Sequence, residues 1–562
     1  MKRLVNILLP LIVLLMSVGC SQKKSNMENE LRDFIARYEA DVSKLQTEAN
    51  KAYWDASITG KDEDYAIAEK NNVKLNNYFT SKEDFELLKR IKEQGNIKDS
   101  LLLRQLDVLY NAYLGNQIDS ALLAEKISKE IEVEKKYSNF RAVVNGKALS
   151  DNDIEEILKT STNSNELQTA WEAHKKIGTV VANDVIELVK IRNKIAKQLG
   201  FDNYHSMSLL LSEQDPNEIS ALFDELDNLT RDSFAQLKDE IDTYLSARNN
   251  VPKDQLMPWH YQNRFFQEAP AIYSVDLDKY YADQNIEKLT ADYYSSIGMD
   301  ISDILGRSDL YEKPGKNQHA YCIDIDNKGD VRVLCNIKPN YSWMGTMMHE
   351  FGHGVYDKYI DLDLPYSLRN PAHTFTTEAI AMIFGRMASN PQWMTDLNVI
   401  SNDEKEKIAG DAYKVLRLEQ LTFSRWAQVM YRFEKAMYEN PDQDLNKLWW
   451  DIVEKYQMIK RPAGRNEPDW ASKVHIATFP AYYHNYLLGE LLASQFNYYI
   501  TSEILKSNDF MNQSFYDNKE VGRFFINKVF EPGSKYKWNE MIEKATGRKL
   551  TAEYYAKQFL GK

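Results

Sequence analysis

The segment His349-Glu350-Phe351-Gly352-His353 constrains this chain more than any other part of its sequence. Two histidines four positions apart on a helix project from the same face, so both imidazoles can bind one metal ion. Glu350 stands next to the first histidine, where its carboxylate can act on a metal-bound water. This stretch is therefore expected to be helical and to form part of a catalytic zinc centre.

A largely buried helix is expected over residues 341–360, because apolar side chains dominate this run and Pro339 and Asn340 precede it. Gly352 and Gly354 lie inside the run, and each costs roughly 1 kcal/mol of helix propensity relative to alanine. Their presence indicates that another part of the chain packs very close there. The alternative interpretation is an ordinary buried helix that contains two histidines with satisfied hydrogen bonds.

A catalytic zinc ion usually has three protein ligands and one open position for water. Glu378 follows a loop bounded by prolines, residues 364–371, and opens an otherwise apolar helical run. An unpaired carboxylate in such a run would be costly, and coordination of a metal would remove that cost. Glu378 is therefore the expected third ligand. Alternatively, it is an exposed glutamate of a first helical turn, stabilised by the helix dipole.

Composition and periodicity indicate a mainly α-helical globular protein. Of the 562 residues, 43% are hydrophobic and 27% are charged, and apolar side chains recur at helical spacing from residue 28 onward. A mature chain of about 540 residues exceeds what one compact core usually organises, which predicts two lobes around a cleft. Residues 1–19 carry two positive charges and no negative ones, so their removal changes the net charge from −13 to −15. An acidic surface argues against nucleic acid as a partner.

The N-terminal end is expected to be a secretory signal over residues 1–19. Lys2 and Arg3 precede an apolar stretch, residues 4–16, and small residues follow. The sequence Ser-Val-Gly-Cys that ends at Cys20 resembles a bacterial lipobox, so Cys20 would be lipidated and would anchor the protein without spanning the membrane. The alternative, a transmembrane helix, would need a longer apolar stretch. We therefore expect an exported bacterial lipoprotein in the outer membrane, facing the periplasm.

Three segments follow from this interpretation. Residues 1–19 are the signal peptide, residues 20–27 are a polar tether without apolar periodicity, and residues 28–562 are the catalytic domain. Within that domain, residues 28–110 are expected to be helical, because their apolar side chains recur at helical spacing.

A β-hairpin is expected over residues 320–335, because apolar and polar residues alternate on both sides of a two-residue loop, Lys328-Gly329. This register places Cys322 opposite Cys335, at a position where side chains lie close together. In an oxidising compartment these two thiols would form a disulfide. The alternative is two reduced, buried thiols that act as small hydrophobic side chains.

The stretch from His349 to Glu378 resembles the angiotensin-converting-enzyme family of gluzincin peptidyl-dipeptidases. In that family His-Glu-x-Gly-His is followed by Leu-Pro-x-x-Leu-Arg and then by the glutamate ligand before Ala-Ile; residues 364–369 and 378–380 match. Further matches stand at residues 49–54, 170–172 and 473–476. The resemblance implies a two-lobed helical metallopeptidase with a deep central channel and a small β-hairpin beside the zinc helix. It also implies that residues 28–110 form helices that cover this channel as a lid.

The resemblance also implies an activity, the release of dipeptides from the C-terminus of peptides. Zinc held by His349, His353 and Glu378 would lower the pKa of a bound water, and Glu350 would take its proton before attack on the peptide carbonyl. Two alternatives stay open. One is an oligopeptidase of the thimet type, which has the same zinc motif and cuts internal bonds. The other is a lipoprotein that captures peptides for uptake without catalysis.

Substrate-binding roles follow from the resemblance as well. Lys473 and Tyr482 would hold the free C-terminal carboxylate of the peptide. His475 and Tyr486 would stabilise the oxyanion formed at the carbonyl. His319-Ala320 matches a family motif on an edge strand that pairs with the extended substrate backbone.

The chain departs from the family in three places. The family's Tyr-x-Arg-Tyr corresponds to residues 482–486 either with one residue inserted or with a shifted helix start, so the oxyanion donor is either Tyr483 or Tyr486. His484 replaces the arginine that helps to bind an activating chloride, which argues against chloride activation. Met382 replaces the aspartate that follows the glutamate ligand, so the partner that orients a zinc histidine is unidentified. A substrate-binding glutamine could correspond to Tyr261 or Gln262.

Overall fold

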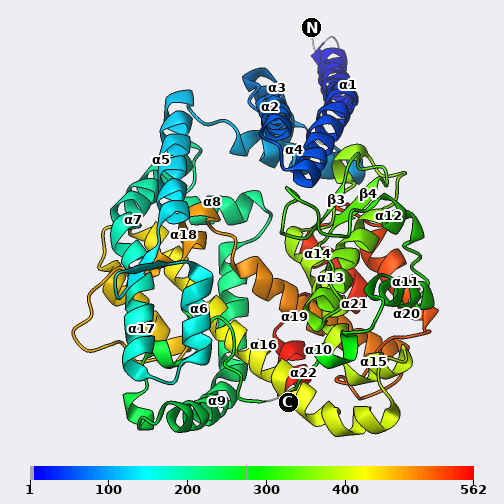
Figure 1. The fold of residues 1–562 in the computed structure, drawn as a ribbon. Coiled ribbons are helices and arrows are strands. Elements are labelled where there is room, and N and C mark those ends of the chain that lie inside the picture. The colour runs from blue at the N-terminus through cyan, green and yellow to red at the C-terminus, as the bar shows by residue number, and fades with distance from the viewer. Residues whose placement is uncertain (1–4, 96, 274, 562) are drawn as a thin grey trace.

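The structure, a computed structural model, describes residues 5–95, 97–273 and 275–561, with side chains from residue 27 onward. Within these residues the chain is mainly α-helical, and its strands form two small antiparallel sheets of two strands each (Figure 1). One of these hairpins packs beside the helix that carries the histidine motif. The predicted mainly α-helical fold class is therefore confirmed. The deep channel between two lobes stays a prediction.

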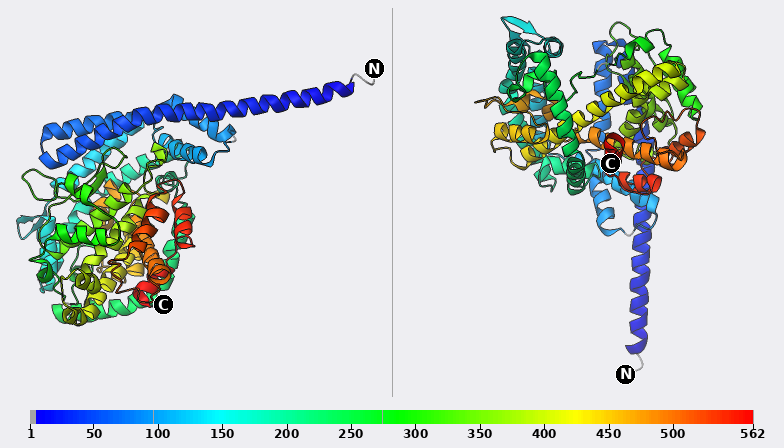
Figure 2. Two further views of the ribbon diagram at one scale, coloured as in Figure 1. Left: turned by 90° about the vertical axis from the view of Figure 1, so that its right-hand side faces the viewer. Right: turned by 90° about the horizontal axis from the view of Figure 1, so that it is seen from below.

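Four helices at the N-terminal end form a group of their own. They are α1 (Val5–Thr59), α2 (Asp62–Tyr78), α3 (Lys82–Gln94) and α4 (Ser100–Gly115). Their buried apolar side chains form a hydrophobic cluster that is separate from the main core and includes Tyr366 from a later loop. The first part of α1 extends far from the rest of the chain (Figure 2), and residues 20–27, the predicted tether, continue this helix. The lid role of these helices stays a prediction.

The predicted signal peptide, residues 1–19, and the predicted lipidation site, Cys20, lie outside the residues whose side chains the structure describes. Among the helices of the described ranges, none is both long enough and apolar enough to cross a membrane. The signal peptide and the lipid anchor stay predictions.

The remaining helices surround one continuous hydrophobic core, whose buried residues extend from Val133 to Phe559. Figure 1 shows two sets of helices, with α16 (Asn402–Glu439) running from one set to the other. The first set comprises α5 (Ser120–Asn139), α6 (Asp151–Thr160), α7 (Ser164–Gln198), α8 (Tyr204–Leu211), α9 (Pro216–Asn249), α17 (Leu445–Tyr456) and α18 (Val474–Thr478), with the hairpin of β1 (Ala142–Val144) and β2 (Lys147–Leu149). The second set comprises α10 (Asp278–Tyr281), α11 (Ile286–Ser296), α12 (Ser302–Arg307), α13 (Tyr341–Lys358), α14 (Thr374–Gly385), α15 (Pro391–Asp396), α19 (His484–Tyr499), α20 (Lys519–Phe525), α21 (Trp538–Thr546) and α22 (Glu553–Leu560).

Helices α13 and α14 carry the histidine motif and Glu378, and a side chain caps the beginning of each. Asn340 Oδ1 accepts a hydrogen bond from the Trp343 N–H at 2.8 Å. His373 Nδ1 accepts one from the Phe375 N–H at 3.2 Å. Each cap satisfies a backbone donor that has no partner inside its helix, and so fixes where the helix starts.

Glycines allow α13 and α14 to pack backbone against backbone. A Cβ atom on Gly352 would lie only 2.8 Å from the Cα atom and 3.1 Å from the N atom of Ala381. A Cβ atom on Gly385 would lie 3.4 Å from the carbonyl oxygen of Gly345. The expectation that another segment packs very close to Gly352 is thus confirmed, and the segment is α14.

The hairpin beside α13 consists of β3 (Tyr321–Asp324) and β4 (Val331–Leu334). Cys322 pairs with Val333 and not with Cys335, so the predicted register is wrong. Both cysteines are free thiols, and the predicted disulfide is wrong as well. The alternative interpretation, two reduced thiols, holds for the structure.

A side chain at the end of β3 explains the error in register. Asp324 Oδ1 accepts hydrogen bonds from the backbone N–H groups of Asp326 and Asn327, at 3.2 and 3.0 Å. These bonds stabilise a loop over residues 326–329, closed by a hydrogen bond from the Ile325 N–H to the Asp330 carbonyl at 3.0 Å. Aspartate side chains that bind the backbone in this way favour turns longer than the two-residue loop that the sequence pattern predicts.

Candidate active site

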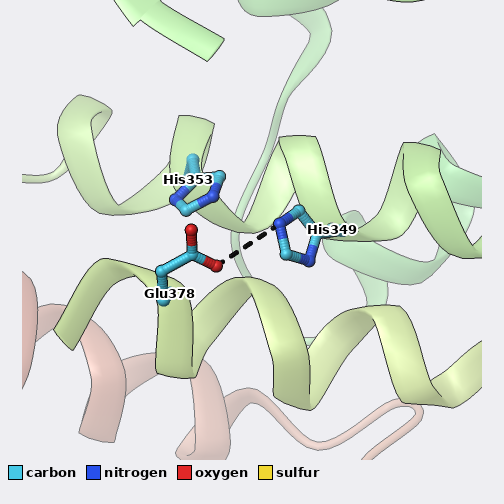
Figure 3. A group of neighbouring side chains, drawn as sticks. All are labelled: His349, His353 and Glu378. Carbon is cyan, nitrogen blue, oxygen red and sulfur yellow. Dashed lines mark ion pairs between the residues drawn. The ribbon is translucent and has the colours of Figure 1, made fainter. Parts of the chain in front are cut away.

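The three predicted metal ligands lie together at the contact between α13 and α14. His349 and His353 lie one turn apart on the same face of α13, and Glu378 of α14 points toward them (Figure 3). One potential ligand atom from each side chain lies within 4.8 Å of the other two. His349 Nε2 is 3.6 Å from Glu378 Oε2. Two ligands of one tetrahedral zinc ion lie roughly 3.4 Å apart, so this spacing suits a single ion.

The electrostatics of these side chains favour a bound cation. Burial lowers the pKa of His349 to about 4, and burial together with His349 lowers the pKa of His353 to about 3. Both imidazoles are therefore neutral near pH 7 and can donate a lone pair to a metal. Burial raises the pKa of Glu378 to about 7, while burial and the charge of Glu378 raise that of Glu350 to about 8. Two neutral imidazoles and the Glu378 carboxylate form a donor set that fits zinc, and the carboxylate of Glu350 lies beside them.

Thr377 provides an orienting partner for one of the histidines. Its Oγ1 atom lies 2.8 Å from His353 Nδ1, which leaves Nε2 of that imidazole available for a metal. The sequence comparison left this partner unidentified, because Met382 replaces the family's aspartate. The only local signal was a hydroxyl residue immediately before the expected third ligand.

Two clefts adjoin the ligands, and Glu350 lines both of them. The first has a volume of about 460 Å³ and is lined by residues 320–324 of the β3 segment and by Asp357 of α13, among others. The second has a volume of about 440 Å³ and is lined by Tyr341 and Glu419, among others. This central position suits Glu350 for a general base that acts on a substrate extending through both clefts.

Strand β3 has an unpaired edge on the first cleft. Within the described residues, β4 is the one strand that pairs with β3. An unpaired edge can bind an extended peptide through backbone hydrogen bonds. Ala320 lines the cleft, as expected for such a contact. His319 is exposed, and its backbone N–H donates to Asn317 Oδ1 at 3.0 Å, so that N–H is already engaged.

Lys473 is a buried cation without a carboxylate partner within the described residues. Its Nζ atom donates to Gln267 Oε1 at 2.5 Å, and no ion pair is formed. Burial, followed by the charge of Arg264, lowers the pKa of Lys473 to about 8, so the ammonium remains mainly charged near pH 7. Nζ also lies 5.3–5.6 Å from three ring centroids, those of Phe265, Trp426 and Tyr483. An ammonium with one polar acceptor keeps donors free for an anion.

Gln267 is a candidate site residue that the sequence analysis missed, because it is the hydrogen-bond partner of Lys473. The two residues considered there are engaged elsewhere: the Tyr261 hydroxyl donates to Asp242 Oδ1 at 2.8 Å, and the Gln262 side chain bonds the backbone at 3.0 and 3.2 Å. Gln267 contacts Lys473 across a separation of 206 positions, so no local pattern could have identified it.

Three tyrosines divide between the Lys473 contact and the metal ligands. Tyr483 accepts a hydrogen bond from Trp426 Nε1 at 2.8 Å and faces Lys473. The rings of Tyr482 and Tyr486 lie 5.5 Å apart. Burial, followed by Tyr486 and then Glu378, raises the pKa of Tyr482, while burial and the charge of Glu378 raise the pKa of Tyr486. Tyr483 thus occupies the place by Lys473 that the resemblance gave to Tyr482. Tyr486 is the one of the two candidate oxyanion donors that lies near Glu378.

Two further histidines have different surroundings. His475 Nδ1 is buried without a hydrogen-bond partner in the described part of the chain, and its ring lies 5.4 Å from that of Tyr483. Burial and Lys473 lower its pKa to about 4, so it is neutral and free to bond a substrate. His484 pairs with Gln214 at 2.8 Å, and burial holds its pKa well below the usual value. His484 therefore offers no positive charge to a chloride ion.

Comparisons with known proteins agree with this geometry. A family model described as angiotensin-converting enzyme matches residues 25–559. The chain is 22% identical to an angiotensin-converting enzyme of Theromyzon tessulatum, with 94% of this chain and 90% of that protein covered. It is 23% identical to an angiotensin-converting enzyme of Mesocricetus auratus, with 93% of this chain and 41% of that protein covered. The chain therefore belongs to the angiotensin-converting enzyme family of metallopeptidases.

Proposed function

We propose that this protein is a peptidyl-dipeptidase that uses one zinc ion to release dipeptides from peptides with a free C-terminus. The observation that carries the proposal is Lys473, a buried ammonium with one amide acceptor and no carboxylate partner among the described residues. Glu268 and Glu155 are near enough to raise the pKa of Lys473, but neither forms an ion pair with it. A buried charge without a direct partner is costly, and a substrate carboxylate would provide that partner. Lys473 therefore supports recognition of the C-terminal carboxylate, with Gln267 and Tyr483 beside it.

A short series of ring contacts connects Lys473 with the metal ligands. The Tyr483 ring lies 5.6 Å from Lys473 Nζ on one side and 5.3 Å from the Tyr486 ring on the other. Tyr486 in turn lies near Glu378, whose charge contributes to the raised pKa of its hydroxyl. A peptide bound by its carboxylate at Lys473 would thus have its last residues beside the catalytic groups, which supports cleavage near the C-terminus.

The chain's own side chains would each have a defined part in hydrolysis. Zinc held by His349, His353 and Glu378 would supply Lewis-acid activation of water and of the scissile carbonyl. Glu350 would accept a proton from the attacking water and then deliver it to the leaving amine.

Two neutral donors would assist at the carbonyl oxygen. Tyr486 lies near Glu378, and His475 has a free ring nitrogen. A donor aimed at the developing oxyanion contributes on the order of 3 kcal/mol in comparable acyl-transfer sites.

Product mapping tests the proposal. An N-terminally acetylated peptide with a free C-terminus and its C-terminally amidated twin are incubated with the protein, and the products are identified by mass spectrometry. We expect dipeptide release from the free acid and slow cleavage of the amide. Equal cleavage of both at internal bonds would support the thimet-type alternative, and binding of both without products would support a peptide-capturing lipoprotein.

We also propose that the protein is exported and anchored to a bacterial membrane through lipidated Cys20, in the outer membrane and facing the periplasm. The sequence around Cys20 supports this. Metabolic labelling with a radioactive fatty acid should label the wild-type protein and not Cys20→Ala. Label retained by the variant would contradict the anchor.

A further inference from the structure

The second of the two clefts, with a volume of about 440 Å³, continues into a hollow that the proposed mechanism does not use. This hollow has a volume of about 300 Å³ and is lined by residues 269–273 and 275–278 and by one face of α16, among others. Tyr341 and Glu419 line both spaces. A side chain of a substrate bound at the metal ligands can therefore reach Glu419.

Glu419 is a carboxylate without a partner. It forms no hydrogen bond or ion pair within the described residues, although water in the cleft can reach it. The cleft walls raise its pKa to about 7 by desolvation, followed by the nearby charge of Glu268, and no cation lowers it.

Two of the cations near this cleft are already engaged among the described residues, and the third, Lys473, acts on the charge of Glu268 and not on that of Glu419. Arg386, which also lines the cleft, is paired with Glu490. Lys159 forms an exposed ion pair with Glu268 at 3.5 Å, a contact that contributes little in water. The cleft thus has an excess of negative charge at Glu419.

The position of Glu419 indicates which residue of a bound peptide would lie nearest to it, namely the C-terminal one. Glu419 lines the hollow together with Ala269, which stands two positions after Gln267, and Gln267 binds Lys473 at 2.5 Å. Lys473 is the group that supports binding of the C-terminal carboxylate. The side chain that comes closest to Glu419 and Glu268 would accordingly be that of the last residue of the peptide.

We propose that Glu419, assisted by Glu268, forms a subsite for a cationic side chain, so that the enzyme prefers peptides ending in lysine or arginine. This inference rests on the proposed function, because Lys473 sets the direction in which the peptide binds. A cationic side chain would pair with Glu419, whose exposed carboxylate lies on the wall that the cleft and the hollow share. A peptide ending in glutamate would place like charges together and bind poorly.

The test compares acetylated peptides that differ only in the last residue, lysine, leucine or glutamate. For the wild-type protein we expect kcat/KM to be at least about tenfold higher for lysine than for leucine, and lowest for glutamate. In Glu419→Gln this ratio should fall to about twofold or less. Glu406→Gln is the matched control, because Glu406 lies on the same helix with a side chain that is 79% exposed and should keep the wild-type ratio.

A second set of peptides places lysine at the penultimate position instead. A preference that appears only there would overturn the placement of the last residue, and an unchanged lysine preference in Glu419→Gln would overturn the subsite. Dipeptide release without a preference for lysine would reject the subsite and leave the proposed function intact.

Binding separates the two proposals if no dipeptide is released. The same peptides are titrated into Glu350→Gln by calorimetry, which does not depend on cleavage. Tighter binding of lysine-ended than of leucine-ended peptides supports the subsite even if the proposed reaction is wrong. Equal binding of the two overturns it.

Discussion

Replacing Gly352 by alanine tests whether the close packing of α13 and α14 sets the metal geometry. The added Cβ atom would lie 2.8 Å from Ala381 Cα, whereas ordinary contacts begin at 3.4 Å, so the two helices must separate by about 0.6 Å. The atoms it meets belong to the backbone of α14 and cannot rotate away. Because His349 and His353 lie on α13 and Glu378 lies on α14, this shift exceeds the roughly 0.2 Å within which metal–ligand distances hold.

The substitution also affects stability. Alanine favours a helix over glycine by about 1 kcal/mol, and overpacking of this kind costs about 1–3 kcal/mol, so we expect a net loss of up to about 2 kcal/mol. Zinc affinity, measured by competition with a chelator, should fall about tenfold to a hundredfold. Gly410→Ala in α16 is the control, because no atom lies within 4 Å of its added Cβ, and it should be neutral or stabilising. Wild-type zinc affinity and thermal stability in Gly352→Ala would refute the reasoning.

Three further predictions concern the same centre. Glu350→Gln should keep zinc and lose about 10²-fold to 10⁴-fold in kcat, whereas His353→Ala should lose both zinc and activity; rapid turnover by the first variant would exclude Glu350 as the base. Thr377→Val should weaken zinc binding about tenfold, while Thr377→Ser should bind zinc almost as tightly as the wild type. Equal zinc affinities of Thr377→Val and the wild type in chelator competition would show that Thr377 does not orient His353. Glu378 must be ionised to bind zinc, and its pKa is raised to about 7. Zinc affinity should therefore fall as the pH drops below about 7, by roughly tenfold per pH unit below about pH 6. Calorimetric titrations that show the same zinc affinity between pH 5 and 8 would contradict this.

The metal centre could be predicted from the sequence because each of its ligands is indicated by residues close to it in the chain. Two histidines at helical spacing require one face of one helix, and a carboxylate in an apolar run requires a counter-charge. The cost of Gly352 also indicated a close neighbour, which the structure identifies as Ala381 of α14. Each of these inferences depends on spacing within one element or on a single unfavourable residue.

The errors and omissions come from contacts that spacing does not encode. The hairpin register depended on Asp324, whose side chain binds backbone N–H groups of the loop and moves Cys322 away from Cys335. Gln267 reaches Lys473 only because the fold brings together two segments that are 206 positions apart. An inserted residue likewise shifted which tyrosine faces Lys473, and only the three-dimensional arrangement could show that it is Tyr483.

The most direct test of the central claim is the relation between bound zinc and turnover. Protein depleted of metal with a chelator is titrated with zinc, and elemental analysis of the metal is compared with the rate of dipeptide release from a free-acid peptide. A mechanism that uses one zinc ion predicts a rate of dipeptide release that rises in proportion to bound zinc and saturates at one ion per chain, with no recovery in His353→Ala. Full turnover by the metal-depleted protein, or saturation with zinc without any peptide cleavage, would contradict it.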